Sequence, residues 1–329
     1  MCIAILSTTH PDYRFIIINN RDEFLARPTS RANWWPAPQT HILSARDLAR
    51  PAHGTWLGVT KTGRIAVLTN CLETNCARAV GTRSRGDVIN AWLTASSEHP
   101  AAANGHVEEF IGELKQSRDL NSVGGFNLLL GDIGEPEPGT LAIVSNRSAN
   151  MECCNGEVQV RRVSGGSGQT IALSNMTLEG EGADHTKAWK KILLGESLTA
   201  DAITASLKNG EDEDALVERL FNVLSTDTLP RLPGEQKPEA YLGVFRESIF
   251  IPVLGKASEK HQEGDVDWNA KLLDPVFMEG LYGTQTQTVI LVSKNDRRVR
   301  YIARTLYDED GQPLSPEERD QSFEFQVEL

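Results

Sequence analysis

The chain has 329 residues, of which 40% are hydrophobic, so it can bury a sizeable core, and disorder is not its expected state. Its formal charge of −12 argues against a nucleic-acid partner or an anionic membrane surface, because both need a broad positive field. No stretch reaches the roughly 20 apolar residues of a transmembrane segment, and the start lacks the basic region of a signal peptide. We therefore expect a cytoplasmic protein without a transmembrane segment.

The first half of the chain is predicted to be mostly β-strand. Residues 2–7 and 14–18 flank "THPDY", whose Pro and Asp favour a turn, and predict an antiparallel hairpin. A second hairpin is predicted around "KTG", where Gly63 is available for a positive φ. Further strands are expected at 126–130, 141–145, 158–163 and 171–174, and helices at 85–95, where Ser84 can cap, and 106–116.

The second half is predicted to be richer in helix before strands return. Helical periodicity covers 184–195, 198–209 and 211–225, and strands are expected at 241–251, 288–293, 299–305 and 322–329. Residues 255–270 are polar and aperiodic and predict a mobile loop. We expect one α+β domain over residues 1–329, built from antiparallel sheets covered by helices.

The cysteines do not predict a metal site or a disulfide framework. Their number is odd and no CxxC pair occurs among Cys2, Cys71, Cys76, Cys153 and Cys154. All but Cys2 are interpreted as reduced thiols that pack as small apolar residues. No haem-attachment motif is present, so the sequence predicts no cofactor.

Cys2 is different because removal of the initiator methionine would leave it with both a thiol and a free α-amino group. The amine has an ordinary pKa of about 7.7–8.0 and the thiol about 8.5, so the amine can take the thiol proton near neutral pH. This predicts an amino-terminal nucleophile that needs no histidine.

The polar run "NNRDE" follows the apolar residues 15–18 and is placed by the hairpin beside the chain start. We expect Asn20 to line the site, Asp22 to hold the ammonium, and Arg21 to stabilise a thiolate or a substrate carboxylate while Glu23 holds its guanidinium. The alternative is a strand end with a capped turn and an internal ion pair.

Acyl transfer also needs hydrogen-bond donors for an oxyanion, and asparagine amides can supply them. Asn70, Asn127 and Asn175 each lie near the end of an apolar run. Asn70 and Asn175 are favoured because they follow strand-like runs. Hydrogen bonding at a turn or sheet edge is the alternative for all three.

An ordered set of motifs resembles the NRDE family, which includes relatives of transport and Golgi organisation protein 2. The motifs are "MCI" at 1–3, "NRDEF" at 20–24, "RP" at 27–28, "GTWLG" at 54–58, "LTN" at 68–70, "GFNLLLGD" at 125–132, "LSN" at 173–175 and "YGT" at 282–284. The resemblance implies an amino-terminal-nucleophile (Ntn) hydrolase fold, a four-layer αββα sandwich. It also implies catalytic roles for Cys2, Asp22, Asn70 and Asn175.

The resemblance leaves two functions open. One is a cysteine hydrolase of an amide or thioester in a small acyl substrate; the other is a non-catalytic carrier of acyl-coenzyme A or haem. "RAVGTRSRG" offers Arg78, Arg83 and Arg85 for phosphate contacts. Many family members have Arg after "YGT", whereas this chain has Gln285, which removes a positive charge from the predicted ligand site. Family links to Golgi organisation, secretion and mitochondria imply association with those organelles.

Overall fold

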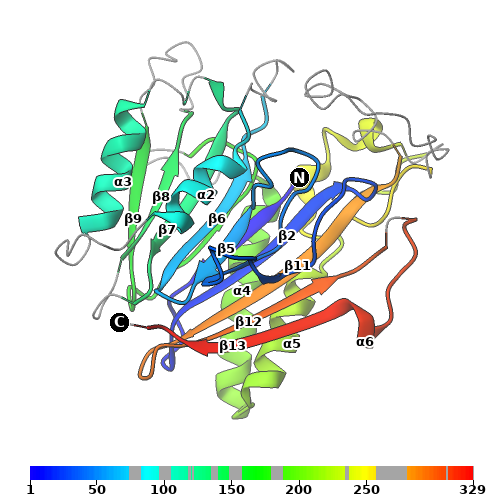
Figure 1. The fold of residues 1–329 in the computed structure, drawn as a ribbon. Helices are drawn as coiled ribbons and strands as arrows, with labels where there is room; N and C mark the ends of the chain where they lie inside the picture. The colour runs from blue at the N-terminus through cyan, green and yellow to red at the C-terminus, as the bar shows by residue number, and fades with distance from the viewer. Residues whose placement is uncertain are drawn as a thin grey trace.

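The computed structural model describes residues 1–73, 83–95, 105–117, 120, 122–134, 140–147, 158–178, 188–233, 237–256, 280–308 and 310–328. These residues form two antiparallel sheets. The first contains, in spatial order, β10 (Thr170–Leu173), β1 (Ile3–Ser7), β2 (Tyr13–Phe24), β11 (Tyr282–Ser293), β12 (Arg298–Thr305) and β13 (Asp320–Gln326) (Figure 1). The second contains β3 (Asn33–Trp34), β4 (Ile42–Ser44), β5 (Leu57–Thr60), β6 (Arg64–Asn70), β7 (Phe126–Asp132), β8 (Thr140–Ser145) and β9 (Gln159–Ser164).

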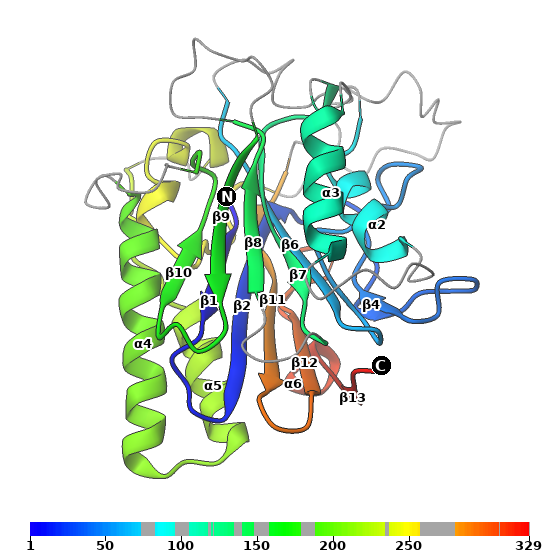
Figure 2. The same cartoon turned by 90° about the vertical axis from the view of Figure 1, so that its left-hand side faces the viewer.

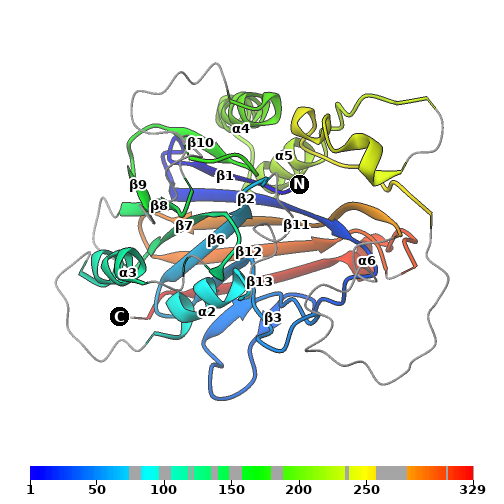
Figure 3. The ribbon, with the colours of Figure 1, turned by 90° about the horizontal axis from the view of Figure 1, so that it is seen from above.

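Helices cover the outer faces of the two sheets. Apolar residues from both sheets share one core cluster, which lies between them. A second cluster packs α2 (Gly86–Thr94) and α3 (Gly105–Gln116) on the seven-stranded sheet, and a third packs α4 (Lys190–Asn209) and α5 (Glu213–Leu224) on the six-stranded sheet. The order of the layers is seen in Figures 2 and 3. The predicted four-layer αββα sandwich is confirmed.

The six-stranded sheet has two apolar faces, and successive side chains of β2 point alternately to one face and to the other. Phe15 and Ile17 of β2 belong to the cluster between the sheets, whereas Ile16 and Ile18 belong to the cluster under α4 and α5. Successive side chains of a strand point to opposite faces, so a strand covered on both sides must be apolar at every position. The continuous apolar run at the start of β2 satisfies that requirement.

The two predicted hairpins are confirmed. β1 pairs with β2 in a register that places Ile3 opposite Asn20, and β5 pairs with β6 through a turn in which Gly63 has φ 98°. The strands expected from 126 to 174 and the helices at 85–95 and 106–116 also form, with small differences at their ends. No helix among the described residues is long and apolar enough to cross a membrane.

Three predicted elements were wrong: the end of the second strand, the two helices at 184–195 and 198–209, and the strand at 241–251. β2 does not stop at Ile18 but continues through the polar run to Phe24, because β1 pairs with it as far as Asn20 and β11 pairs with it as far as Phe24. Residues 184–195 and 198–209 do not form two helices, since the single helix α4 runs unbroken from Lys190 to Asn209.

The expected strand at 241–251 is replaced by two 3-10 helices, η3 (Pro238–Tyr241) and η4 (Phe245–Glu247). Tyr241, Phe245 and Ile251 instead build a separate apolar cluster with Tyr282. The predicted loop at 255–270 lies outside the described residues except for its first two positions. A short helix, α6 (Pro316–Arg319), precedes β13 and carries a capping box at Ser315.

Candidate functional site

The pairing of the strands brings the chain start to one end of the six-stranded sheet. Ile3 pairs with Asn20 on β2 and Ala4 pairs with Leu173 on β10, so continuing both registers sets Cys2 between Arg21 and Asn175. Alternation then directs Cys2 and Arg21 toward the space between the sheets.

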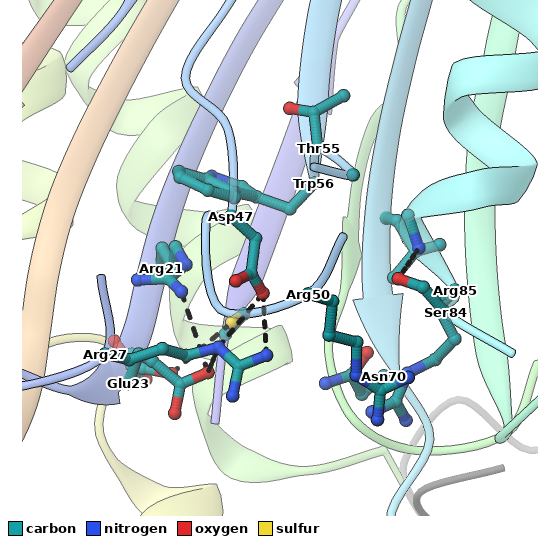
Figure 4. A pocket seen from close by; sticks show the side chains of 15 residues that line it. Arg21, Glu23, Arg27, Asp47, Arg50, Thr55, Trp56, Asn70, Ser84 and Arg85 are labelled. Carbon is teal, nitrogen blue, oxygen red and sulfur yellow. Dashed lines mark hydrogen bonds and ion pairs between the residues drawn. The ribbon is translucent and has the colours of Figure 1, made fainter. Parts of the chain in front are cut away.

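A cavity of about 120 Å³ opens at this end of the sandwich. Figure 4 shows its side chains at close range. Cys2 and part of the polar run of β2 meet residues from the segment before β5, from the end of β6 and from the start of α2. The lining residues are Cys2, Arg21, Asp22, Glu23, Arg27, Asp47, Arg50, Gly54, Thr55, Trp56, Leu68, Asn70, Ser84, Arg85 and Gly86.

The carboxylate of Asp22 holds the chain start from a fully buried position. Its Oδ2 lies 3.3 Å from the Met1 ammonium and 3.9 Å from Lys191 Nζ, and its Oδ1 accepts a hydrogen bond of 2.8 Å from Thr284 Oγ1. Lys191 Nζ also donates to the Met1 carbonyl over 2.6 Å, and the Met1 ammonium donates to the Tyr282 hydroxyl. Two cations therefore share one buried carboxylate.

Cys2 lies on the cavity side of the same strand end. Its thiol is 3.8 Å from the Asp22 carbonyl oxygen, and its own carbonyl accepts a hydrogen bond of 2.7 Å from Ser174 Oγ. Burial raises the pKa of the Cys2 thiol, and the nearby ammonium opposes that rise only in part. The resting group is therefore a thiol, and any nucleophilic role requires a base that removes its proton.

Arg21 lines the cavity and contacts three other side chains. Its guanidinium lies 3.7 Å from a Glu23 carboxylate oxygen and 4.4 Å from the centre of the Trp56 ring, and it donates to Gln285 Oε1. Gln285 is the extra residue of an irregularity in β11, between Thr284 and Thr286. A neutral acceptor thus stands beside Arg21 at the position where a second arginine would have repelled it.

The four asparagines lie in different surroundings. Asn70 lines the cavity. Asn175 is buried beside it, and its side-chain oxygen has no hydrogen-bond partner among the described residues. The Asn20 amide instead donates to two backbone carbonyls at the end of α5 and before β11, and the Asn127 amide donates to the carbonyls of Ser174 and Met176.

Of the nine catalytic and ligand-binding residues predicted around Cys2, the structure brings five to the cavity surface, and Arg85, predicted for phosphate contacts, lines it as well. The five are Cys2, Arg21, Asp22, Glu23 and Asn70. The other four, Asn20, Asn127, Asn175 and Gln285, are buried around it and are not among the lining residues. The catalytic or binding roles of all nine residues remain predictions.

Sequence reasoning missed several residues that contact the site. Thr284 and Tyr282 belong to the "YGT" motif, which was noted without a role for either residue. Lys191 gave no signal, because a lysine in an amphipathic helix is expected on the solvated face. Arg50 gave none either, since it lies in an irregular segment.

Of the other four cysteines, only Cys71 lies among the described residues. Burial raises the pKa of Cys71 to about 12, which fits its interpretation as a packing residue. Cys76, Cys153, Cys154 and Arg78 lie outside the described residues. Within the described ranges, no group of three or more His, Cys, Asp or Glu side chains is placed to hold a metal ion.

Comparison with known proteins gives matches over most of the chain. The family model for "Transport and Golgi organisation 2" matches residues 1–308. The human Transport and Golgi organization protein 2 homolog is 28% identical over 299 residues, covering 91% of this chain and 88% of its own. An uncharacterised protein of Saccharomyces cerevisiae is 27% identical over 319 residues, with 94% and 93% covered.

Two solved structures are similar at lower identity. A C2A mutant of conjugated bile acid hydrolase from Clostridium perfringens has 11% identity and a TM-score of 0.43, with 99% of this chain and 98% of that chain covered. A Caenorhabditis elegans ortholog of N-acylethanolamine-hydrolyzing acid amidase has 13% identity and a TM-score of 0.40, with 67% and 85% covered.

Proposed function

The chain belongs to the Transport and Golgi organisation 2 family, and from that premise we propose that it is a cysteine hydrolase of the amino-terminal-nucleophile type. Its substrate would be an amide or thioester of a small acyl group. One observation carries the proposal. The Cys2 side chain lines a cavity, while the ammonium of the chain start lies 3.3 Å from the buried carboxylate of Asp22.

The proposed reaction begins after Met1 is removed. The α-amine of Cys2 takes the proton of its own thiol, and the thiolate attacks the acyl carbon of the substrate. The carbon–nitrogen or carbon–sulfur bond then breaks, and the ammonium returns the proton to the leaving group. Water gives up a proton to the amine as it attacks the acyl-enzyme thioester. The bond between the Cys2 sulfur and the acyl carbon then breaks, the ammonium returns the proton to the Cys2 thiolate, and the carboxylic acid leaves.

The surrounding residues would orient these steps. Asp22 would hold the ammonium, which moves by one residue, or roughly 3.3 Å along the strand, when Met1 leaves. Lys191 would lose the Met1 carbonyl as its acceptor and keep Asp22 as its counter-ion. Asn70 at the cavity wall and the Asn175 amide beside it would supply donors to the oxyanion.

A matched pair of cysteine variants tests the enzyme proposal. Intact mass of the protein purified from cells should show that Met1 is absent. Cys2→Ala should then abolish turnover of a panel of acyl amides and acyl thioesters, whereas Cys71→Ala should keep it, because Cys71 is buried outside the cavity lining. Retained methionine, or equal turnover in wild-type protein and Cys2→Ala, would refute the mechanism.

The second candidate is a carrier that binds its ligand without turnover. The raised pKa of the Cys2 thiol favours it, because a protonated thiol is a poor nucleophile. Acyl-coenzyme A and haem are the ligands that the family resemblance implies, and both remain predictions. A carrier should keep ligand binding and cellular function in Cys2→Ala, so the same variant separates the two candidates.

A further inference from the structure

The two sides of the cavity differ in how their charges are matched. On one side, Arg27 lies 2.7 Å from Asp47 and 3.7 Å from Glu23, and Arg21 also pairs with Glu23. On the other side, Arg50, Asn70 and Arg85 line the cavity (Figure 4), and the charges of the two arginines repel each other. The carboxylates of Glu23 and Asp47 thus form ion pairs with arginines on the first side, and the carboxylate of Asp22 pairs with the ammonium of the chain start.

Arg50 and Arg85 are left with almost no compensation. Neither forms an ion pair with any described residue, and Arg85 donates one long hydrogen bond of 3.4 Å, to the carbonyl of Gly125. Burial and the charge of Arg50 together lower the pKa of Arg85 to about 10, although Glu23, Cys71 and Glu73 oppose that change. Burial and the charge of Arg27 lower the pKa of Arg50, while Asp47 and Asp87 oppose this from beyond ion-pair distance.

We propose that Arg50 and Arg85 form an anion subsite that binds a carboxylate or phosphate group of the ligand. A partly buried guanidinium without a counter-ion is costly, and two that repel each other are more so. An oxyanion between them would remove both costs. The planar guanidinium also matches carboxylate and phosphate oxygens with paired hydrogen bonds.

The position of the subsite restricts the substrate of the proposed hydrolase, and to that extent the inference rests on the proposed function. Cys2 and the two arginines line the same cavity of about 120 Å³. A group bound by Arg50 and Arg85 therefore lies close to the bond that Cys2 would attack. The preferred substrates should carry an oxyanion near the scissile amide or thioester.

Binding of a simple anion tests the subsite without any chemistry. Inorganic phosphate and acetate would be titrated separately into full-length wild-type protein by calorimetry, with chloride used to keep the ionic strength constant. We expect one saturable site per chain for at least one of the two anions, and the stronger ligand indicates whether phosphate or carboxylate is preferred. Arg50→Gln and Arg85→Gln should each weaken that binding at least tenfold.

Two further variants keep the result interpretable. Arg162→Gln removes an arginine that is paired with Glu108 outside the cavity, and it should leave anion binding unchanged. In chloride buffer without phosphate or acetate, Arg50→Gln should melt at the wild-type temperature or above it, because the variant removes a repulsion rather than a contact. A lower melting temperature, or saturable binding that persists in both cavity variants, would overturn the proposal, as would absence of binding to the wild-type protein.

The outcome is separable from that of the proposed function. Cys2→Ala should bind the anion with wild-type affinity and have no turnover. Anion binding without turnover in the wild-type protein would contradict only the hydrolase, whereas turnover of neutral acyl substrates without anion binding would contradict only the subsite.

Discussion

Asp22→Asn is the variant that most directly tests the electrostatics of the chain start. Asparagine keeps an oxygen that can accept the hydrogen bond from Thr284 but removes the charge that faces two cations. Asp22 and Lys191 are both fully buried. The second cation facing Asp22 is the ammonium of the chain start, which the proposed function assigns to Cys2 once Met1 is removed. Removing one partner of a buried ion pair costs about 3–5 kcal/mol, and because the chain start is only partly buried we expect about 3 kcal/mol.

The assay is urea unfolding at pH 7, with the slope m used to check that the unfolded states are comparable. Asp47→Asn is the matched control, because its carboxylate is 24% exposed, and it should cost about 1 kcal/mol. In the Asp22→Asn background, Lys191→Met should recover at least about 1 kcal/mol, since it removes a cation that has lost its partner. The reasoning is wrong if Asp22→Asn costs no more than the control, or if Lys191→Met recovers nothing.

The same pair predicts a pH dependence whose sign can be worked out. Burial lowers the pKa of Lys191 below 10.5, and the charge of Asp22 opposes that change. Without Asp22 the folded protein binds protons still more weakly, so the stability of Asp22→Asn should rise with pH relative to wild type. Its deficit in the free energy of unfolding should therefore shrink between pH 7 and pH 10, and a constant deficit would contradict this assignment.

Three other predictions concern the scaffold. Burial raises the pKa of Glu213, but hydrogen bonds led by that from Arg298 outweigh it and set the value at about 2. Glu213→Gln should therefore lose on the order of 3 kcal/mol at pH 7 in urea titrations, and the difference from wild type should vanish as the pH falls from the ordinary 4.5 toward 2. A Cβ on Gly54 would lie 2.7 Å from the backbone of α2, so Gly54→Ala should lower stability by about 1–3 kcal/mol in thermal melts, whereas Gly112→Ala, with open space around it, should raise it by up to about 1 kcal/mol. Cys71, with its pKa of about 12, should resist iodoacetamide at pH 8 until urea unfolds the protein. If Cys71 of the folded protein were labelled as fast as an exposed thiol, its burial would be contradicted.

Much of the fold follows from local patterns in the sequence. The apolar runs around "THPDY" and "KTG" determine two hairpins, and the periodicity of residues 213–224 determines an amphipathic helix with Asp212 as its cap. Because the first hairpin fixes its own register, the proximity of Cys2 to the polar run of β2 was predictable as well. These features depend on residues that lie close together along the chain, so sequence reasoning could find them.

Other features depend on surfaces that meet only in the folded protein. β2 continues through Asp22 because β11, about 260 residues away, pairs with it, and no local pattern shows that partner. Residues 241–251 look like a strand, but Tyr241 and Phe245 reach the core from 3-10 turns.

The set of residues that lines the cavity is the clearest example of a feature that depends on tertiary contacts. The sequence by itself determined that a thiol would stand beside a run of charges. Only the tertiary structure decided that Lys191 would be buried against Asp22, and that Arg50 and Arg85 would line the same cavity as Asp22 without an ion pair to any described residue. The physical reason is that burial and charge pairing are properties of the packed layers, whereas a sequence pattern reports only the conformation that each segment favours alone.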